Sequence, residues 1–238
     1  MRSEIQALRG IAVLLVVVFH LWPSALPGGF VGVDVFFVIS GFLITGQLVR
    51  EVDRTGRVSL AGFWARRARR ILPAALVVLA ACALLTKAAV PETQWDQFFG
   101  EIVASAAYVE NWHLAEAAVD YQAADDAPSP VRHFWSLSVE EQFYLVWPLL
   151  IVAALLAGRR WIPWTLGAVT AASFAWSLHE TAADPAAAYF VTPTRAWEFG
   201  VGGLLALLPL TRRATPALTV AGLAAIAAAS ALLGEGTP

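Results

Sequence analysis

Charged residues are scarce in this chain of 238 residues: Asp, Glu, Lys and Arg make up 14% of it, where soluble domains average about 25%. The one cysteine, Cys82, cannot form an internal disulfide and has no partner for a cysteine metal cluster. Neither sign of charge is in excess, because 16 basic residues face 18 acidic ones. The sequence therefore argues against a soluble domain, a disulfide scaffold, a metal centre and a nucleic-acid partner.

Apolar residues are abundant instead. They make up 58% of the chain, the mean hydropathy is +0.65, and there are ten tryptophans. One soluble core of this size cannot bury so much apolar surface, and tryptophan is enriched where chains cross a membrane–water boundary. We expect an all-α, multi-pass membrane helix bundle.

Stretches without Lys, Arg, Asp or Glu mark the expected membrane spans, each of which needs about 20 mostly apolar residues. A shorter apolar run, Phe199–Thr211, can span only if its helix starts near Thr194 and carries Arg195 and Glu198 into the membrane. About seven spans are expected. The other six are Gly10–Val33, Val35–Val49, Ile71–Thr86, Gln142–Gly158, Trp161–Leu178 and Ala214–Gly234.

Basic residues in the short loops set the orientation of the spans. Arginines near the start of the chain, between the second and third spans, and after the fourth and sixth spans all lie on one side if the N-terminus is cytoplasmic and uncleaved. The opposite side receives the acidic loop 91–132. Trp95, Phe98, Phe99, Ile102 and Ala106 recur there at helical spacing, which predicts an amphipathic helix lying on the outer face.

Ionisable residues inside a span are candidates for function. Arg9 and His20 are eleven residues apart, so in a helix they share a face, about 16 Å apart along the axis. On this face Arg9 could bind an anion at the inner end, and His20 could accept or donate a proton further out. A snorkelling arginine and a structural histidine are the alternative. Asp34 could pair with His20, and Ser40 with Gly41 would let another helix approach closely.

Four arginines precede the third span, in the segment Phe63–Pro73. Arg67 and Arg70 share one helix face, as do Arg66 and Arg69. Paired guanidinium groups suit phosphates, although arginines at the cytoplasmic end of a span are also ordinary topology markers.

The segment His133–Pro148 carries acids into the fourth span from outside. Ser136, Glu140 and Tyr144 line one helix face, where the carboxylate could orient an imidazole or act as a general acid or base. Glu141 points elsewhere and is expected to be solvated. Arg195 and Glu198, three residues apart, are read as an internal ion pair. Asn111, Trp112 and His113 are read as loop structure.

Together these motifs resemble the acyltransferase-3 family of integral-membrane acyltransferases. The matching pieces are Arg-x10-His at Arg9 and His20, G-x-D-x-F-F-x-x-S-G-F at Gly32–Phe42, R-R-x-x-R-I at Arg66–Ile71, and W-S-L-x-V-E-x-Q-F-Y at Trp135–Tyr144. Asn111-Trp112 and Asp120-Tyr121 resemble the subgroup that often carries a C-terminal SGNH hydrolase-like domain.

The resemblance implies an acyl donor, commonly acetyl-CoA, bound from the cytoplasm as co-substrate with no further cofactor. It also implies an acceptor hydroxyl on an envelope glycan or glycolipid outside the cell membrane. Arg66, Arg67, Arg70 and Arg9 would bind the donor, His20 would be catalytic base or acyl relay, and Glu140 would assist it. Arg9 would also belong to the catalytic set. Asp34, Ser40, Ser136, Tyr144, Arg195 and Glu198 would support the site.

Family members usually have about ten spans, and no SGNH domain follows Pro238. We therefore expect a membrane domain over residues 1–238 that is incomplete at its C-terminus, with an SGNH domain supplied at that end or in trans. Two other classes stay open. One is a proton-coupled transporter using His20, Asp34, Glu140 and Glu198, and the other is a non-catalytic membrane scaffold.

Overall fold

The computed structural model describes residues 3–118, 128–209 and 215–234, and these form α-helices and short 3-10 turns with no β-strand among them. The all-α prediction is thus confirmed. Tertiary contacts divide the chain into two compact units, one of residues 1–49 with 198–238 and the other of residues 50–197. The prediction of a single domain stays a prediction.

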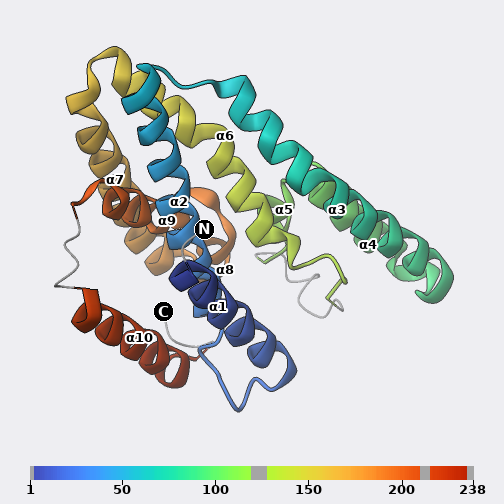
Figure 1. The fold of residues 1–238 in the computed structure, drawn as a ribbon. Helices are drawn as coiled ribbons and strands as arrows, with labels where there is room; N and C mark the ends of the chain where they lie inside the picture. The colour runs from blue at the N-terminus through green and yellow to red at the C-terminus, as the bar shows by residue number, and fades with distance from the viewer. Residues whose placement is uncertain (1–2, 119–127, 210–214, 235–238) are drawn as a thin grey trace. The chain divides into compact units, whose positions relative to one another are not determined.

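Figure 1 shows the helices in chain order, and their bounds follow the apolar runs of the sequence. Four within the described residues are long and apolar enough to cross a membrane: α1 (Ser3–Leu21), α2 (Val31–Thr55), α3 (Leu60–Ala89) and α6 (Phe134–Leu156). The other three expected spans are also helical: α7 (Ile162–Ala183), α9 (Thr192–Leu207) and α10 (Thr215–Leu232). Because α9 starts at Thr192, Arg195 and Glu198 both lie within it.

The first unit is held together where glycines remove a side chain between two helices. A Cβ on Gly41 of α2 would overlap the backbone of Phe199 in α9, and one on Gly202 would overlap the carbonyl of Val38. The rings of Phe37 and Phe199 stack with centroids 4.5 Å apart. The close helix approach predicted at Ser40 and Gly41 is confirmed.

The same unit brings α1 and α10 close to the chain entering α2. Gly29 and Gly32 leave room for the backbone carbonyls of Leu15 and Ala12 in α1. The amide of Gly28 donates to the carbonyl of Ser230 in α10, 3.0 Å away. These contacts use backbone atoms, which is the usual way for helices to pack where lipid gives no hydrophobic driving force.

The second unit contains α3, α6 and α7, the shorter helices α4 (Trp95–Ala106), α5 (Glu110–Ala118) and α8 (Pro185–Phe190), and the 3-10 turns η1 (Glu92–Gln94) and η3 (Arg159–Trp161). The helix predicted over Trp95–Ala106 is confirmed as α4. Its apolar side packs on α3, where Ile102 meets Leu79, and its placement on the outer face of the membrane stays a prediction.

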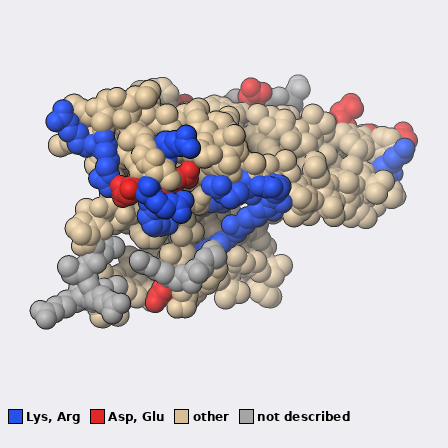
Figure 2. Space-filling model, turned by 45° about the horizontal axis from the view of Figure 1, so that its top comes forward, with Lys and Arg blue, Asp and Glu red and all other residues tan. Residues whose placement is uncertain are grey.

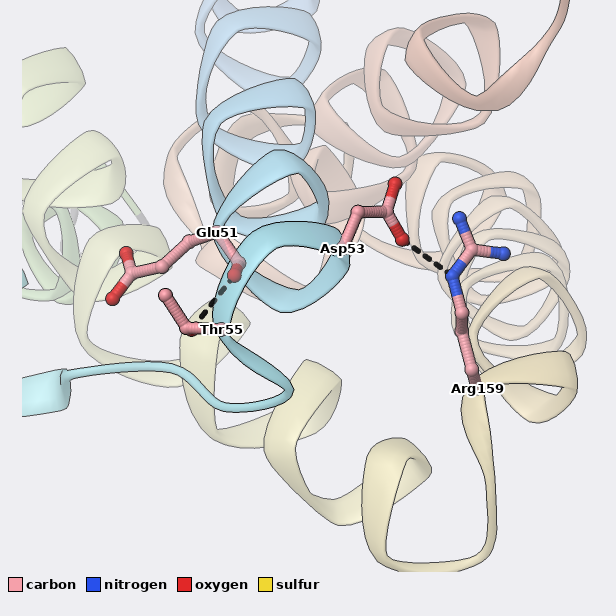
Figure 3. Close-up of polar contacts among 4 residues, drawn as sticks. All are labelled: Glu51, Asp53, Thr55 and Arg159. Carbon is pink, nitrogen blue, oxygen red and sulfur yellow. Dashed lines mark hydrogen bonds and ion pairs between the residues drawn. The ribbon is translucent and has the colours of Figure 1, made fainter.

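An exposed ion pair joins the end of α2 to the turn before α7 in this unit (Figure 3). The Nε atom of Arg159 lies 2.5 Å from Oδ1 of Asp53. The hydroxyl of Thr55 donates to the carbonyl of Glu51, and the Glu51 carboxylate accepts from the amide of Ser59, which closes the α2–α3 turn. Exposed pairs of this kind add little stability.

Candidate functional site

Tyr144 connects the arginine motif of α3 with the acidic motif of α6. The guanidinium of Arg67 lies 4.6 Å from the centroid of the Tyr144 ring and 5.7 Å from that of Phe63. The Tyr144 hydroxyl donates a hydrogen bond to the Glu140 carboxylate, one helical turn away. Three residues that the sequence placed in two separate motifs thus form one contact group.

A proline in α6 fixes this group against α3. Pro148 lies four residues after Tyr144 and has no backbone N–H, so the Tyr144 carbonyl lacks its helical donor. The indole of Trp64 in α3 donates to that carbonyl instead, at 3.0 Å. This hydrogen bond therefore fixes the position of α3 along α6 at which Arg67 contacts Tyr144.

The arginines of α3 differ in exposure. Arg67 is half-buried, whereas Arg66, Arg69 and Arg70 are exposed. The helix begins at Leu60, before the apolar run, so the motif is helical as its spacing predicts. Exposed arginines also occur at residues 50–57 and 159–160, and Figure 2 shows Lys and Arg side chains gathered on part of the visible face.

A second polar network centres on Gln142 and was not predicted. Its Nε2 donates to the Tyr108 carbonyl at 2.8 Å and to Oδ1 of Asn111 at 2.9 Å. Its Oε1 accepts from the hydroxyl of Thr192 at 2.5 Å and from the indole of Trp112 at 3.1 Å. The network joins α5, α6 and α9, so every group on Gln142 is satisfied.

Asn111 closes this network. It is fully buried, and its Nδ2 donates to the carbonyl of Phe190 and the hydroxyl of Thr192. The interpretation of residues 111–113 as loop structure was wrong, because they belong to α5. The partners of Asn111 lie about 80 residues away in sequence, and spacing alone does not reveal them.

Glu141 and Tyr108 lie next to this network. The sequence interpretation of Glu141 as solvated was wrong: it is half-buried, and its Oε1 has no hydrogen-bond partner in the described part of the chain. Tyr108 adopts a left-handed backbone, with φ of 56°, between α4 and α5. Burial, with a smaller effect of the nearby Glu141 charge, raises the pKa of the Tyr108 phenol.

Arg195 is half-buried and contacts two aromatic rings. Its guanidinium lies 4.7 Å from the ring centroid of Tyr189 and 6.0 Å from that of Trp135, and its Nε donates to the Tyr189 carbonyl. The predicted ion pair with Glu198, which is buried, stays a prediction.

Two acids of the loop 91–132 are buried together in the α4–α5 region. Glu101 accepts hydrogen bonds from Gln97 at 3.1 Å and from Ser129. Glu110 is 0% exposed, and neither of its oxygens has a hydrogen-bond partner among the described residues. Burial and the charge of Glu101 raise the pKa of Glu110 to about 9 against the weaker effects of Ser105 and Arg132, so it is protonated at neutral pH.

Most of the other predicted residues lie in the first unit. Arg9 is half-buried and His20 exposed on the continuous helix α1, as the predicted shared face requires. Nδ1 of His20 lies 2.8 Å from the Val16 carbonyl. Asp34 and Ser40 are half-buried in α2, and the pairing of Asp34 with His20 stays a prediction. In the second unit the half-buried Ser136 donates to the His133 carbonyl.

Within residues 3–118, 128–209 and 215–234, no group of three or more His, Cys, Asp or Glu could hold a metal ion. The contact group described above consists instead of a cation, a hydroxyl-bearing side chain and a carboxylate.

The fold, an all-α bundle with several membrane-spanning helices, defines a multi-pass membrane protein. The family model described as an acyltransferase domain matches residues 2–235, and the chain belongs to this acyltransferase-3 family.

Two curated relatives carry names of the same chemistry. The peptidoglycan O-acetyltransferase OatA of Listeria monocytogenes is 36% identical over 221 residues, which cover 90% of this chain and 35% of the relative. The O-acetyltransferase OatA of Staphylococcus aureus is 38% identical over 208 residues, covering 86% of this chain and 34% of the relative. The chain thus spans about a third of the length of these relatives. No solved structure matches it significantly.

Proposed function

We propose that the chain is the membrane domain of an O-acyltransferase. It would move an acyl group, most simply acetyl, from cytoplasmic acyl-CoA to a hydroxyl of an envelope glycan or glycolipid on the other side of the cell membrane. The names of the relatives, one of them a peptidoglycan O-acetyltransferase, support the O-acetyl chemistry and the glycan acceptor.

The donor would be held by Arg66, Arg67 and Arg70 of α3 with Arg9 of α1, whose guanidinium groups suit the phosphates of coenzyme A. The observation that carries the proposal is the contact group of Arg67, Tyr144 and Glu140. It combines a cation that can bind a phosphate with a hydroxyl and a carboxylate that can relay a proton, and these groups suit acyl transfer from a coenzyme A thioester.

His20 would act as the catalytic base or as an acyl relay. As a base it accepts the proton of the acceptor hydroxyl while the oxygen attacks the thioester carbon. The new C–O bond forms, the C–S bond breaks, and the proton passes to the departing thiolate. As a relay, its ring nitrogen carries the acyl group between the two steps. Glu140 would orient this chemistry or activate the acceptor.

The remaining predicted residues would support these steps. Asp34 and Ser40 lie on α2 and Ser136 on the same helix as Glu140, while Arg195 and Glu198 lie on α9. An SGNH domain, at the C-terminus or in trans, is the proposed partner that completes transfer to the glycan.

Binding of acetyl-CoA to the detergent-purified chain tests the donor side. The variant Arg67→Glu/Arg70→Glu should bind at least about tenfold more weakly. The matched control is Arg69→Glu/Arg160→Glu, which makes the same charge change at two exposed arginines outside the proposed donor site. This variant should bind acetyl-CoA within about twofold of the unchanged chain.

Equal loss in both double variants would mean that the arginines attract the ligand only through total charge. Binding that is unchanged in Arg67→Glu/Arg70→Glu would overturn the proposed donor site. For the chemical step, His20→Ala should abolish acyl transfer in cells while the protein remains inserted, and normal transfer by this variant would remove His20 from the mechanism.

A further inference from the structure

The corner between α4 and α5 turns back toward the apolar part of α3. After α3 ends at Ala89, α4 runs back along it, as Figure 1 shows. Ile102 of α4 packs with Leu79 and Val131, and Leu79 lies ten residues before the end of α3, which is about 15 Å along the helix. The corner at residues 106–110 is therefore not at the outer tip of this hairpin.

The exposed side chains of the corner are apolar. Val103 is 67% exposed, Val109 43% and Trp112 40%. The exposed residues between them are Ala106 and Ala107. An exposed apolar cluster on a loop marks a surface that has a partner.

Within the α3–α4 hairpin, the exposed charges lie at the end away from the corner. Lys87, Glu92 and Asp96 are all exposed where α3 turns into α4. At the level of Leu79, by contrast, the neighbouring α3 residues Leu76, Val77 and Val78 are exposed and apolar, as lipid-facing positions of a spanning helix should be. The hairpin thus becomes more apolar with distance from its outer turn, which is the reverse of a loop in water.

The acids within the corner do not contradict contact with lipid. Glu101 is 4% exposed and Glu110 0%. Glu101 is paired with Gln97 and Ser129, and Glu110 faces Glu101 and Ser105 and is further influenced by Arg132. With Glu110 protonated the pair carries a single negative charge, which the hydrogen bonds from Gln97 and Ser129 to Glu101 offset, so no ionised group of this acid pair is exposed to lipid.

We propose that the α4–α5 corner is a re-entrant membrane segment, with Val103, Val109 and Trp112 against the acyl chains of the leaflet into which the C-terminal end of α3 extends. The occupant of this surface is lipid, because the surface lies level with the lipid-facing side chains of α3. Trp112 fits the boundary of such a segment, since its indole is bonded to Gln142 while its ring remains exposed.

Single cysteines in a Cys82→Ala background test this placement. Val103→Cys and Val109→Cys carry a small fluorophore in liposomes containing doxyl-labelled phosphatidylcholine. Glu92→Cys and Glu116→Cys, at exposed acids of the same loop, are the matched controls. We expect at least twofold stronger quenching by the doxyl lipid at positions 103 and 109 than at the controls. Before labelling, the cysteines at positions 103 and 109 should react with a membrane-impermeant maleimide at least tenfold more slowly than the control cysteines at positions 92 and 116.

Maleimide reaction at positions 103 and 109 as fast as at position 92 would overturn the proposal, because the corner would then lie in water. Slow reaction in native membranes combined with fast reaction in liposomes of the purified chain would also overturn it, because a protein partner would then cover the surface. Val103→Ser/Val109→Ser, which keeps the side chains small, provides a second check: it should leave the helical content unchanged and weaken doxyl quenching at neighbouring Ala106→Cys.

Discussion

Arg67 lies with its guanidinium 4.6 Å from the ring centroid of Tyr144, and the hydroxyl of the same tyrosine donates to Glu140. The tyrosine therefore has two separable roles, one through its ring and one through its hydroxyl. A cation over an aromatic face gains about 0.5–2 kcal/mol, depending on desolvation. The ring orients the arginine, and the hydroxyl orients the acid.

Tyr144→Phe and Tyr144→Leu separate these roles. Phenylalanine keeps the ring under Arg67, so acetyl-CoA binding should stay within about twofold, while loss of the bond to Glu140 should slow acyl transfer by roughly 10-fold to 100-fold. Leucine removes both, and binding should also weaken by about tenfold, equivalent to about 1.4 kcal/mol. Equal binding by the two variants would show that the ring contact does not position Arg67.

Trp64 and Pro148 should be energetically coupled. Trp64→Phe leaves the Tyr144 carbonyl without a donor and should cost about 1–3 kcal/mol in the free energy of unfolding. In a Pro148→Ala background the restored backbone N–H satisfies that carbonyl, so the same change should cost less. A double-mutant cycle measured by thermal unfolding in detergent gives the difference, expected to be about 1 kcal/mol; strictly additive effects would contradict it.

Gly41→Ala should destabilise the first unit, because the new Cβ meets the backbone of Phe199, which cannot move as a side chain can. Overpacking of this kind costs about 1–3 kcal/mol. Gly10→Ala is the matched control, since nothing lies within 4 Å of its Cβ position, and it should be neutral or stabilise α1 by up to about 1 kcal/mol. Melting temperatures that fall equally in both variants would mean that packing at Gly41 is loose.

Gln142→Leu should lower stability by at least about 2 kcal/mol, because it removes the partner of the Tyr108 carbonyl and of the Asn111 amide at once. Thr192→Val removes the hydroxyl that donates to Gln142 and accepts from Asn111 but leaves the Tyr108 carbonyl bonded, so it should cost less. The same Gln→Leu change at Gln94, in the turn after α3, is the control for thermal unfolding. An unchanged melting temperature in Gln142→Leu would show that water replaces the network.

The free energy of unfolding should fall with rising pH through Glu110. Its pKa rises from an ordinary value of 4.5 to about 9 in the folded chain, so folding takes up a proton between these limits. The stabilisation is complete below about pH 4.5 and is lost as the pH rises toward 9. Glu110→Gln does not titrate, so its melting temperature should fall less than that of the unchanged chain between pH 6 and 9.5.

The exposed acid Glu116 on the same helix provides the control, and Glu116→Gln should follow the unchanged chain at every pH. If Glu110→Gln and the unchanged chain lost stability in parallel, the buried acid pair would not be what makes the fold sensitive to alkali.

Hydropathy and spacing were sufficient for the four helices long and apolar enough to cross a membrane, for the helix at Trp95–Ala106 and for the close approach at Gly41, because each depends on residues near one another in the sequence. They were not sufficient for Asn111 and Gln142, whose hydrogen bonds cross about 30 to 80 residues. The count of seven spans stays a prediction, because α7, α9 and α10 are helical but are not among those four.

The burial of three acids likewise could not be predicted from the sequence. Glu101, Glu110 and Glu141 occur in or beside an acidic loop, where solvation is the ordinary expectation. Their burial follows from the return of α4 along α3 and from the packing of α5 on α6, and neither is visible in periodicity. Arg67 differs from its three neighbours for the same reason, since only its side chain lies against Tyr144.

The missing amide hydrogen at Pro148 also bears on movement. Because the indole of Trp64 occupies the place of that hydrogen, α3 and α6 cannot slide past each other without breaking a satisfied bond. An opening that keeps this hydrogen bond therefore moves Trp64, Arg67 and Tyr144 together, and its hinge lies outside the contact between the two helices.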